Sequence, residues 1–80
     1  MEGYNPRLKK LMLEVVDNQI RDNTPPETRK TLERLMANGD TRQKAKEKIA
    51  YVAVLHIYDI LKEGKAFDPM KYVKDLEEIK

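Results

Sequence analysis

A chain of 80 residues, 40% hydrophobic and 38% charged, is long enough for one domain with one hydrophobic core. It contains no cysteine, which excludes disulfides, thiolate zinc sites and cysteine nucleophiles and fits a reducing compartment. The formal net charge of +2 is too small to indicate nucleic-acid binding by itself.

The first ten residues, MEGYNPRLKK, lack the apolar stretch of a signal peptide, and Gly3 is not placed for myristoylation. The longest apolar run is far shorter than the roughly 20 residues that a membrane span needs. We therefore expect a cytoplasmic protein with no membrane partner.

The first predicted helix covers residues 6–22. Asn5 is a preferred N-cap, and Pro6 suits the first helical position because its missing N–H is not needed there. Apolar residues then recur at helical spacing and predict an inner face. That face comprises Leu8, Leu11, Met12, Val15, Val16 and Ile20.

The second predicted helix covers residues 25–38. Thr24 and Glu27 have the spacing of a capping box, in which each side chain binds a free backbone N–H of the other residue. Gly39 suits the left-handed conformation that ends many helices. The apolar stripe is narrow and comprises Leu32, Leu35 and Met36.

The third predicted helix, residues 42–63, is the centre of the expected fold. Thr41 is the preferred N-cap, with Asp40 and Gln43 as the alternative pair, and Gly64 ends the helix. One stripe comprises Ala45, Ile49, Val52, His56 and Ile60. Two further faces comprise Tyr51, Leu55 and Tyr58, and Val54, Ile57 and Leu61. A helix that is apolar on most sides is expected to be covered on most sides.

The fourth predicted helix covers residues 69–79. Asp68 is its expected N-cap, and Phe67 and Tyr72 are placed to form a hydrophobic staple. Its expected inner stripe comprises Met70, Val73, Leu76 and Ile79. No segment alternates polar and apolar residues as a strand does. The sequence thus predicts an all-α fold, a small four-helix domain around the long third helix.

Motifs for catalysis are absent from the sequence. There is no glycine-rich phosphate loop, no G-x-S-x-G elbow and no H-E-x-x-H pair. His56, the single histidine, lies on an apolar stripe, which favours a packed ring over a functional one. We expect a protein that is not an enzyme and has neither cofactor nor metal ligands.

Two surfaces are candidates for binding. Tyr51, Leu55 and Tyr58 are either covered by the fourth helix and the Phe67 loop or left open for a protein partner, including a second copy of the chain. The second surface is basic and comprises Arg7, Lys9, Lys10, Arg42 and Lys44 at the starts of the first and third helices. If those starts share one end of a bundle, their free N–H groups and positive side chains suit a phosphate, another anion or nucleic acid.

Landmarks along the chain resemble a bacterial family of helical domains of unknown function. They are Asn5-Pro6-x-Leu8, Gln19, Pro25-Pro26, Leu32-x-x-Leu35, Ala45, Ile49, Phe67-Asp68 and Tyr72. The family pattern begins NPxLHxxxH and has HEAxHAI in a later helix. The resemblance implies a helical fold across residues 5–76 and carries no known activity.

The family's two histidine pairs, which look like potential metal ligands, are missing here. Lys9 with Leu13 and Gln43 with Glu47 stand at the matching positions. We therefore predict that Lys9 and Glu47 approach each other and form an ion pair where the family pattern would allow a metal bridge. A weaker similarity, to ubiquitin-associated domains, rests on Leu35-Met36 and Gly39, but the aromatic residue of their binding loop is missing.

Taken together, the sequence favours a non-catalytic interaction module whose helix surfaces bind either another protein or a second copy of the chain. The alternative is anion or nucleic-acid binding at the basic end. A protein that has lost its family's metal site is a third hypothesis.

Overall fold

The computed structural model describes residues 6–80, which form four α-helices. The helices are α1 (Pro6–Asp22), α2 (Pro26–Ala37), α3 (Arg42–Glu63) and α4 (Pro69–Glu77). These bounds match the predicted helices to within two residues at each end. No strand occurs among the described residues, so the predicted all-α fold is confirmed. Asn5, the predicted cap of the first helix, lies outside the described residues.

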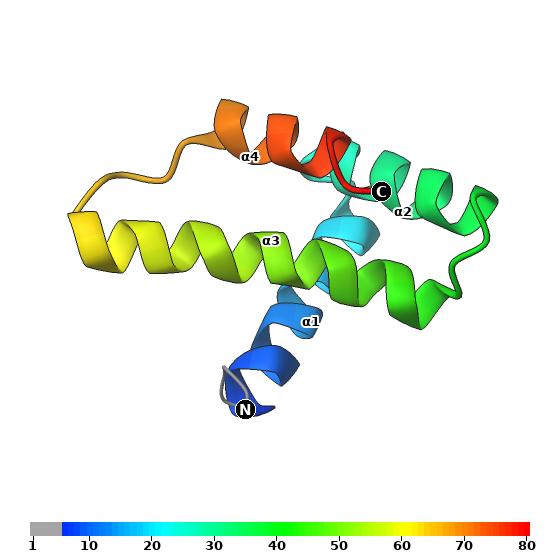
Figure 1. The fold of residues 1–80 in the computed structure, drawn as a ribbon, viewed down its shortest axis with the longest axis horizontal. Coiled ribbons are helices and arrows are strands. Elements are labelled where there is room, and N and C mark those ends of the chain that lie inside the picture. The colour runs from blue at the N-terminus through cyan, green and yellow to red at the C-terminus, as the bar shows by residue number, and fades with distance from the viewer. Residues whose placement is uncertain (1–5) are drawn as a thin grey trace.

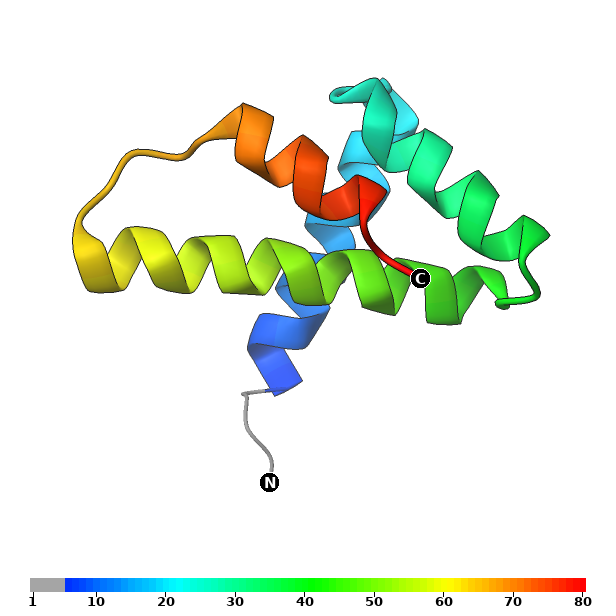
Figure 2. The same cartoon turned by 45° about the horizontal axis from the view of Figure 1, so that its top comes forward.

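Helix α3 is the longest element and contacts each of the other three helices (Figure 1). Helix α1 runs across the middle of α3, whereas α2 and α4 contact each other and pack against α3 (Figure 2). The chain is therefore organised around α3, as predicted, but α1 crosses it steeply and does not run alongside it. No helix within residues 6–80 is both long and apolar enough to span a membrane.

The core draws residues from all four helices. Val16, Leu35, Ile49 and Leu76 are fully buried, one from each helix. Burying a large aliphatic side chain such as these contributes roughly 1.5–3 kcal/mol to folding. Small buried side chains on α3 allow the neighbouring helices to approach closely; these are Ala45, Ala50 and Ala53.

The predicted caps at both ends of α3 and the predicted N-cap of α4 are confirmed, whereas α4 ends at Glu77, two residues before the predicted position. The Thr41 hydroxyl accepts a hydrogen bond from the Lys44 N–H at 3.1 Å, and Gly64 ends α3 with a left-handed φ of 66°. Asp68 accepts bonds from the N–H groups of Met70 and Lys71. The Asp40 side chain, the alternative cap, instead binds Lys48 at 2.7 Å.

The predicted capping box at α2 is wrong. Pro25 occupies the N-cap position without a side-chain cap, and Pro26 begins the helix. The Thr24 hydroxyl instead donates to the Asp22 carbonyl at 3.1 Å, within the turn where Asn23 adopts a φ of 55°. The Thr24 side chain therefore stabilises the turn between α1 and α2 and does not cap α2, so Glu27 has no capping partner there.

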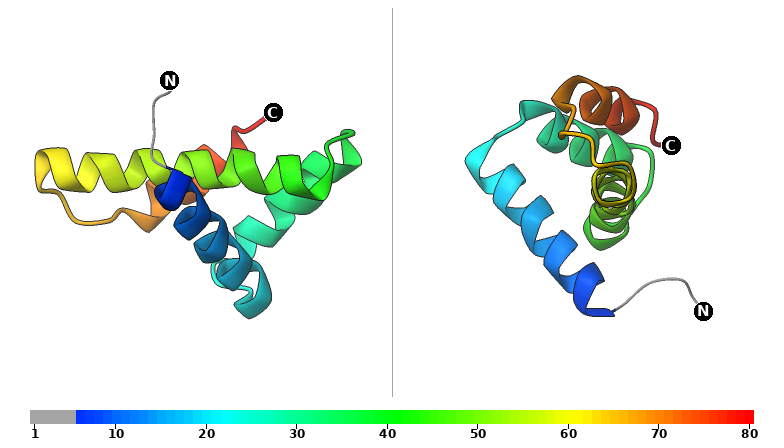
Figure 3. Two further views of the ribbon diagram at one scale, coloured as in Figure 1. Left: turned by 90° about the horizontal axis from the view of Figure 1, so that it is seen from below. Right: turned by 90° about the vertical axis from the view of Figure 1, so that its left-hand side faces the viewer.

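Several residues that were predicted to face the core lie on the surface: Leu11, Val15, Met36 and Met70. The reason is geometric, because α1 contacts its neighbours on one side only and α4 lies at the edge of the molecule (Figure 3). Thr28, Thr31 and Tyr72, which the predicted apolar stripes do not include, are buried. As expected, α3 is covered on most of its sides, because α1, α2 and α4 all contact it, and one apolar strip stays open.

A polar contact inside the core joins three helices. The Gln19 side-chain oxygen accepts hydrogen bonds from the Thr28 hydroxyl at 2.9 Å and from the Tyr72 hydroxyl at 3.1 Å. Burial raises the pKa of Tyr72, although the bond to Gln19 opposes that shift. Because a buried hydroxyl without a partner is costly, this contact specifies how α1, α2 and α4 meet.

Two arginines bind the carboxyl ends of other helices. Arg34 on α2 donates to the carbonyls of Leu76, Glu77 and Ile79 at 3.0, 3.3 and 2.6 Å. Arg29 donates to the Ile20 carbonyl near the end of α1 at 2.6 Å. A positive charge is favourable at this end of a helix, and the bonds satisfy carbonyls that lack a partner within the helix.

Candidate functional site: the exposed face of α3

One side of α3 is apolar and open to solvent. Tyr51, Leu55 and Tyr58 are 58%, 44% and 43% exposed, which confirms that this face is not covered within the described chain. Leu61, one turn further on, is 76% exposed. Viewed along α3, the other helices lie on the remaining sides (Figure 3). Neither α4 nor the Phe67 loop covers this face, because both lie on the opposite side, around His56.

Leu11 and Val15 on α1 are exposed too, but they do not extend this face. Val15 lines a groove of about 230 Å³ with Ile60 and Phe67, on the side of α3 where His56 lies. Single exposed apolar side chains are ordinary, but a strip of them along one helix is typical of a protein contact surface. We refer to the set Tyr51, Leu55, Tyr58 and Leu61 as the apolar face.

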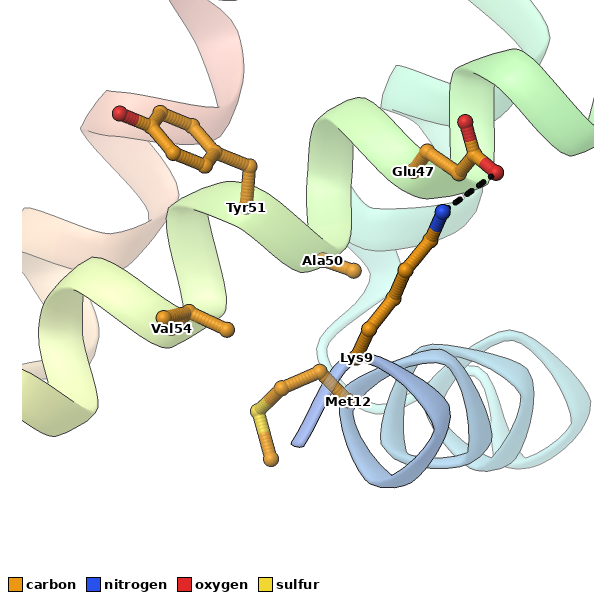
Figure 4. A pocket seen from close by; sticks show the side chains of 6 residues that line it. All are labelled: Lys9, Met12, Glu47, Ala50, Tyr51 and Val54. Carbon is orange, nitrogen blue, oxygen red and sulfur yellow. Dashed lines mark ion pairs between the residues drawn. The ribbon is translucent and has the colours of Figure 1, made fainter. Parts of the chain in front are cut away.

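A small hollow lies beside this face, between α1 and α3 (Figure 4). It has a volume of about 30 Å³, and its lining is largely apolar. The lining residues are Lys9, Met12, Glu47, Ala50, Tyr51 and Val54. Lys9 and Glu47 meet across one end of the hollow, whereas Tyr51 stands at its other rim (Figure 4). The hollow has room for the end of one aliphatic side chain.

The predicted approach of Lys9 and Glu47 is confirmed. Lys9 Nζ lies 3.3 Å from a carboxylate oxygen of Glu47, and the Gln43 amide donates to the same carboxylate at 3.2 Å. The bond from Gln43 and the neighbouring Lys9 lower the pKa of Glu47. Three of the four positions that match the family's histidine pairs therefore meet in space. Both charged side chains are about 40% exposed, so the pair contributes little to stability, at most about 1 kcal/mol.

The basic residues do not gather at one end of the molecule. The first turn of α3 lies beside the end of α2, whereas the first turn of α1 lies near the middle of α3 (Figure 2). Arg42 and Lys44 are exposed at the start of α3, and Arg7 and Lys10 are exposed at the start of α1. Lys9 is half-buried and faces Glu47. Lys46 and Lys48 pair with Asp17 and Asp40. The anion-binding hypothesis thereby loses the shared end on which it depended.

His56 is buried, as predicted, and is a structural centre. Its Nε2 lies 2.8 Å from a carboxylate oxygen of Asp75, and its ring makes edge contacts with Phe67 and Tyr72. The rings of Phe67 and Tyr72 also contact each other, with centroids 5.6 Å apart, which confirms the predicted staple. This cluster attaches α4 and the preceding loop to α3.

Sequence reasoning did not find the hollow or the polar contact at Gln19. In the sequence, Gln19 is only a landmark of the family pattern. Its position on the helix does not indicate that it has hydrogen-bond partners on two other helices. The hollow depends on the crossing angle of α1 over α3, which periodicity does not encode. Within residues 6–80, no group of three or more metal-binding side chains is placed to hold an ion.

Comparison with protein-family models, with curated proteins and with solved structures gave no match to this chain. The resemblance to the bacterial family with the two histidine pairs therefore stays a prediction.

Proposed function

We propose that this chain is a non-catalytic interaction module that associates with a second copy of itself through the apolar face. The observation that carries the proposal is the exposure of Tyr51, Leu55 and Tyr58 on one side of the helix around which the fold is built, with the exposed Leu61 at the edge of that side. These side chains recur every three or four residues, so they form one strip along α3.

A second copy suits this strip for physical reasons. The strip is straight and presented by a 22-residue helix, and an amphipathic helix face is a surface that another helix of the same kind can bury. Large aromatic and aliphatic side chains supply most of the favourable energy of protein interfaces. A chain with only one hydrophobic core gains stability when two copies cover each other's apolar surface.

The test is the mass of the chain in solution. We expect sedimentation equilibrium to show a reversible dimer for the wild-type chain, and a monomer for Leu55→Asp. Met70→Asp is the matched control, because Met70 is 83% exposed but lies on α4, away from the apolar face. That variant is expected to remain a dimer. A wild-type chain that stays monomeric at millimolar concentration would contradict the proposal, and so would equal loss of the dimer in both variants.

A further inference from the structure

Deepening the proposed function, on which it rests, we infer that two copies pair with their α3 helices antiparallel and that Leu61 of each copy fills the hollow of the other. The hollow is the one between Lys9, Met12, Glu47, Ala50, Tyr51 and Val54 (Figure 4). The two-fold axis of this dimer passes close to Leu55, midway along the apolar face.

The first argument is that the projecting side chain and the recess lie on the same helix. Leu61 is 76% exposed in the last turn of α3, whereas Tyr51 and Val54 line the hollow near the middle of the helix. In a two-fold symmetric contact, residue i of one copy meets residue j of the other and j meets i. An antiparallel arrangement centred near Leu55 therefore places each Leu61 opposite the other copy's Tyr51 and hollow, twice in one interface.

The direction of pairing follows from the charges on α3. The first seven residues of the helix carry four positive side chains and one negative: Arg42, Lys44, Lys46, Lys48 and Glu47. Its last five residues contain Asp59 and Glu63 beside Lys62. Antiparallel pairing brings Lys48, which binds Asp40 within its own copy, toward Glu63 of the second copy. It also brings Glu47, which binds Lys9, toward Lys62 of the second copy. Parallel pairing places the positive starts side by side, which costs energy.

Cysteine cross-linking tests the direction and the register, because the chain contains no cysteine of its own. We expect Leu55→Cys alone to form a cross-linked dimer with a short thiol-specific reagent. Glu47→Cys and Lys62→Cys are expected to cross-link only when the two variants are mixed. At a rise of 1.5 Å per residue, the two copies of position 47 lie about 24 Å apart along the antiparallel pair, beyond the reach of the reagent.

Leu61→Asp tests the hollow itself. We expect it to weaken the dimer by on the order of 100-fold in sedimentation, because a carboxylate cannot enter an apolar recess without losing its hydration. Lys62→Asp tests the neighbouring charge pair, because combining it with Glu47→Lys is expected to recover affinity that either charge change loses alone.

The outcomes separate the two proposals. A wild-type dimer that is broken by Leu55→Asp but in which Glu47→Cys cross-links with itself overturns the antiparallel arrangement and leaves the interaction module intact. A dimer that Leu61→Asp does not weaken overturns the filled hollow. A wild-type monomer overturns both the proposed function and this inference.

Discussion

Gln19 shows how one side chain can determine the way that several helices meet. Its single oxygen serves two buried or half-buried hydroxyls, those of Thr28 and Tyr72, which come from two different helices. Neither hydroxyl is identified by hydrophobic periodicity, because that pattern marks where apolar residues recur and not where polar atoms meet. The fold is therefore specified by polar as well as apolar contacts.

We predict that Gln19→Ala lowers the free energy of unfolding by about 2–4 kcal/mol, since both hydroxyls lose their acceptor in the core. For a domain of this size that corresponds to a fall in melting temperature of roughly 10–25 °C. Thermal unfolding followed by circular dichroism measures the change. Asn18→Ala is the control at the neighbouring exposed position, and an equal effect of the two substitutions would contradict the assigned role of Gln19.

Glu47 gives a prediction for the dependence on pH. The bond from Gln43 and the charge of Lys9 lower its pKa from the ordinary value of 4.5. A carboxyl with a lowered folded-state pKa stabilises the fold above its unfolded pKa, and that contribution is lost as the pH falls through the folded-state value. The loss is thus expected below pH 4.5, and it is small because the Glu47 side chain is about 40% exposed and solvent screens its charge.

NMR titration of the Glu47 carboxyl carbon measures this shift directly. We expect Gln43→Ala to move the pKa of Glu47 back toward 4.5, and Lys9→Met to move it in the same direction. The wild-type carboxyl titrating at its ordinary pKa, or a titration that neither substitution changes, would show that the contacts do not persist in solution.

At the scale of helices, the sequence predicts where most helices begin and end, but it predicts their buried faces only in part. Thr41, Gly64 and Asp68 act locally, through hydrogen bonds and backbone angles within a few residues, and their roles are encoded in the neighbouring sequence. Leu11 and Met70 illustrate the opposite case. Their spacing is right for an inner face, but whether a helix side is covered depends on how distant helices cross.

The two threonine positions before helices offer a matched pair. We predict that Thr41→Ala destabilises the fold by about 1 kcal/mol, because the first turn of α3 loses its cap. Thr24→Ala is expected to cost less, since Thr24 caps no helix N-terminus and bonds only to the Asp22 carbonyl on the surface. Urea unfolding of both variants measures the difference. A larger effect at Thr24 would reinstate the capping box at α2.

Arg34 stabilises the carboxyl end of a helix, as Thr41 stabilises an amino end. We predict that Arg34→Met increases amide hydrogen exchange at the carboxyl end of α4 by about tenfold, because the carbonyls of Leu76, Glu77 and Ile79 lose the guanidinium donor. Arg21→Met is the control, since Arg21 pairs only with the adjacent exposed Asp22. Faster exchange spread evenly over all helices would indicate general destabilisation and contradict a local role.

For the whole molecule, the central question is why a small chain leaves so much apolar surface on its longest helix. Sequence periodicity showed that α3 is apolar on several sides, and left open whether the fourth helix or a second copy covers Tyr51, Leu55 and Tyr58. In the structure the fourth helix does not cover these residues, because α4 is anchored around His56 on another side of α3. Self-association supplies the missing cover in our proposal.

That proposal links stability to concentration. If folding and dimerisation are coupled through the apolar face, the melting temperature of the wild-type chain rises with its concentration, because mass action favours the state that binds a second copy. Each tenfold increase above the dissociation constant contributes about 1.4 kcal/mol per mole of dimer. Leu55→Asp removes this dependence, whereas Met70→Asp retains it. Scanning calorimetry across a hundredfold range of concentration distinguishes the cases, and a wild-type melting temperature that stays constant over that range would mean that α3 keeps its apolar face open to water.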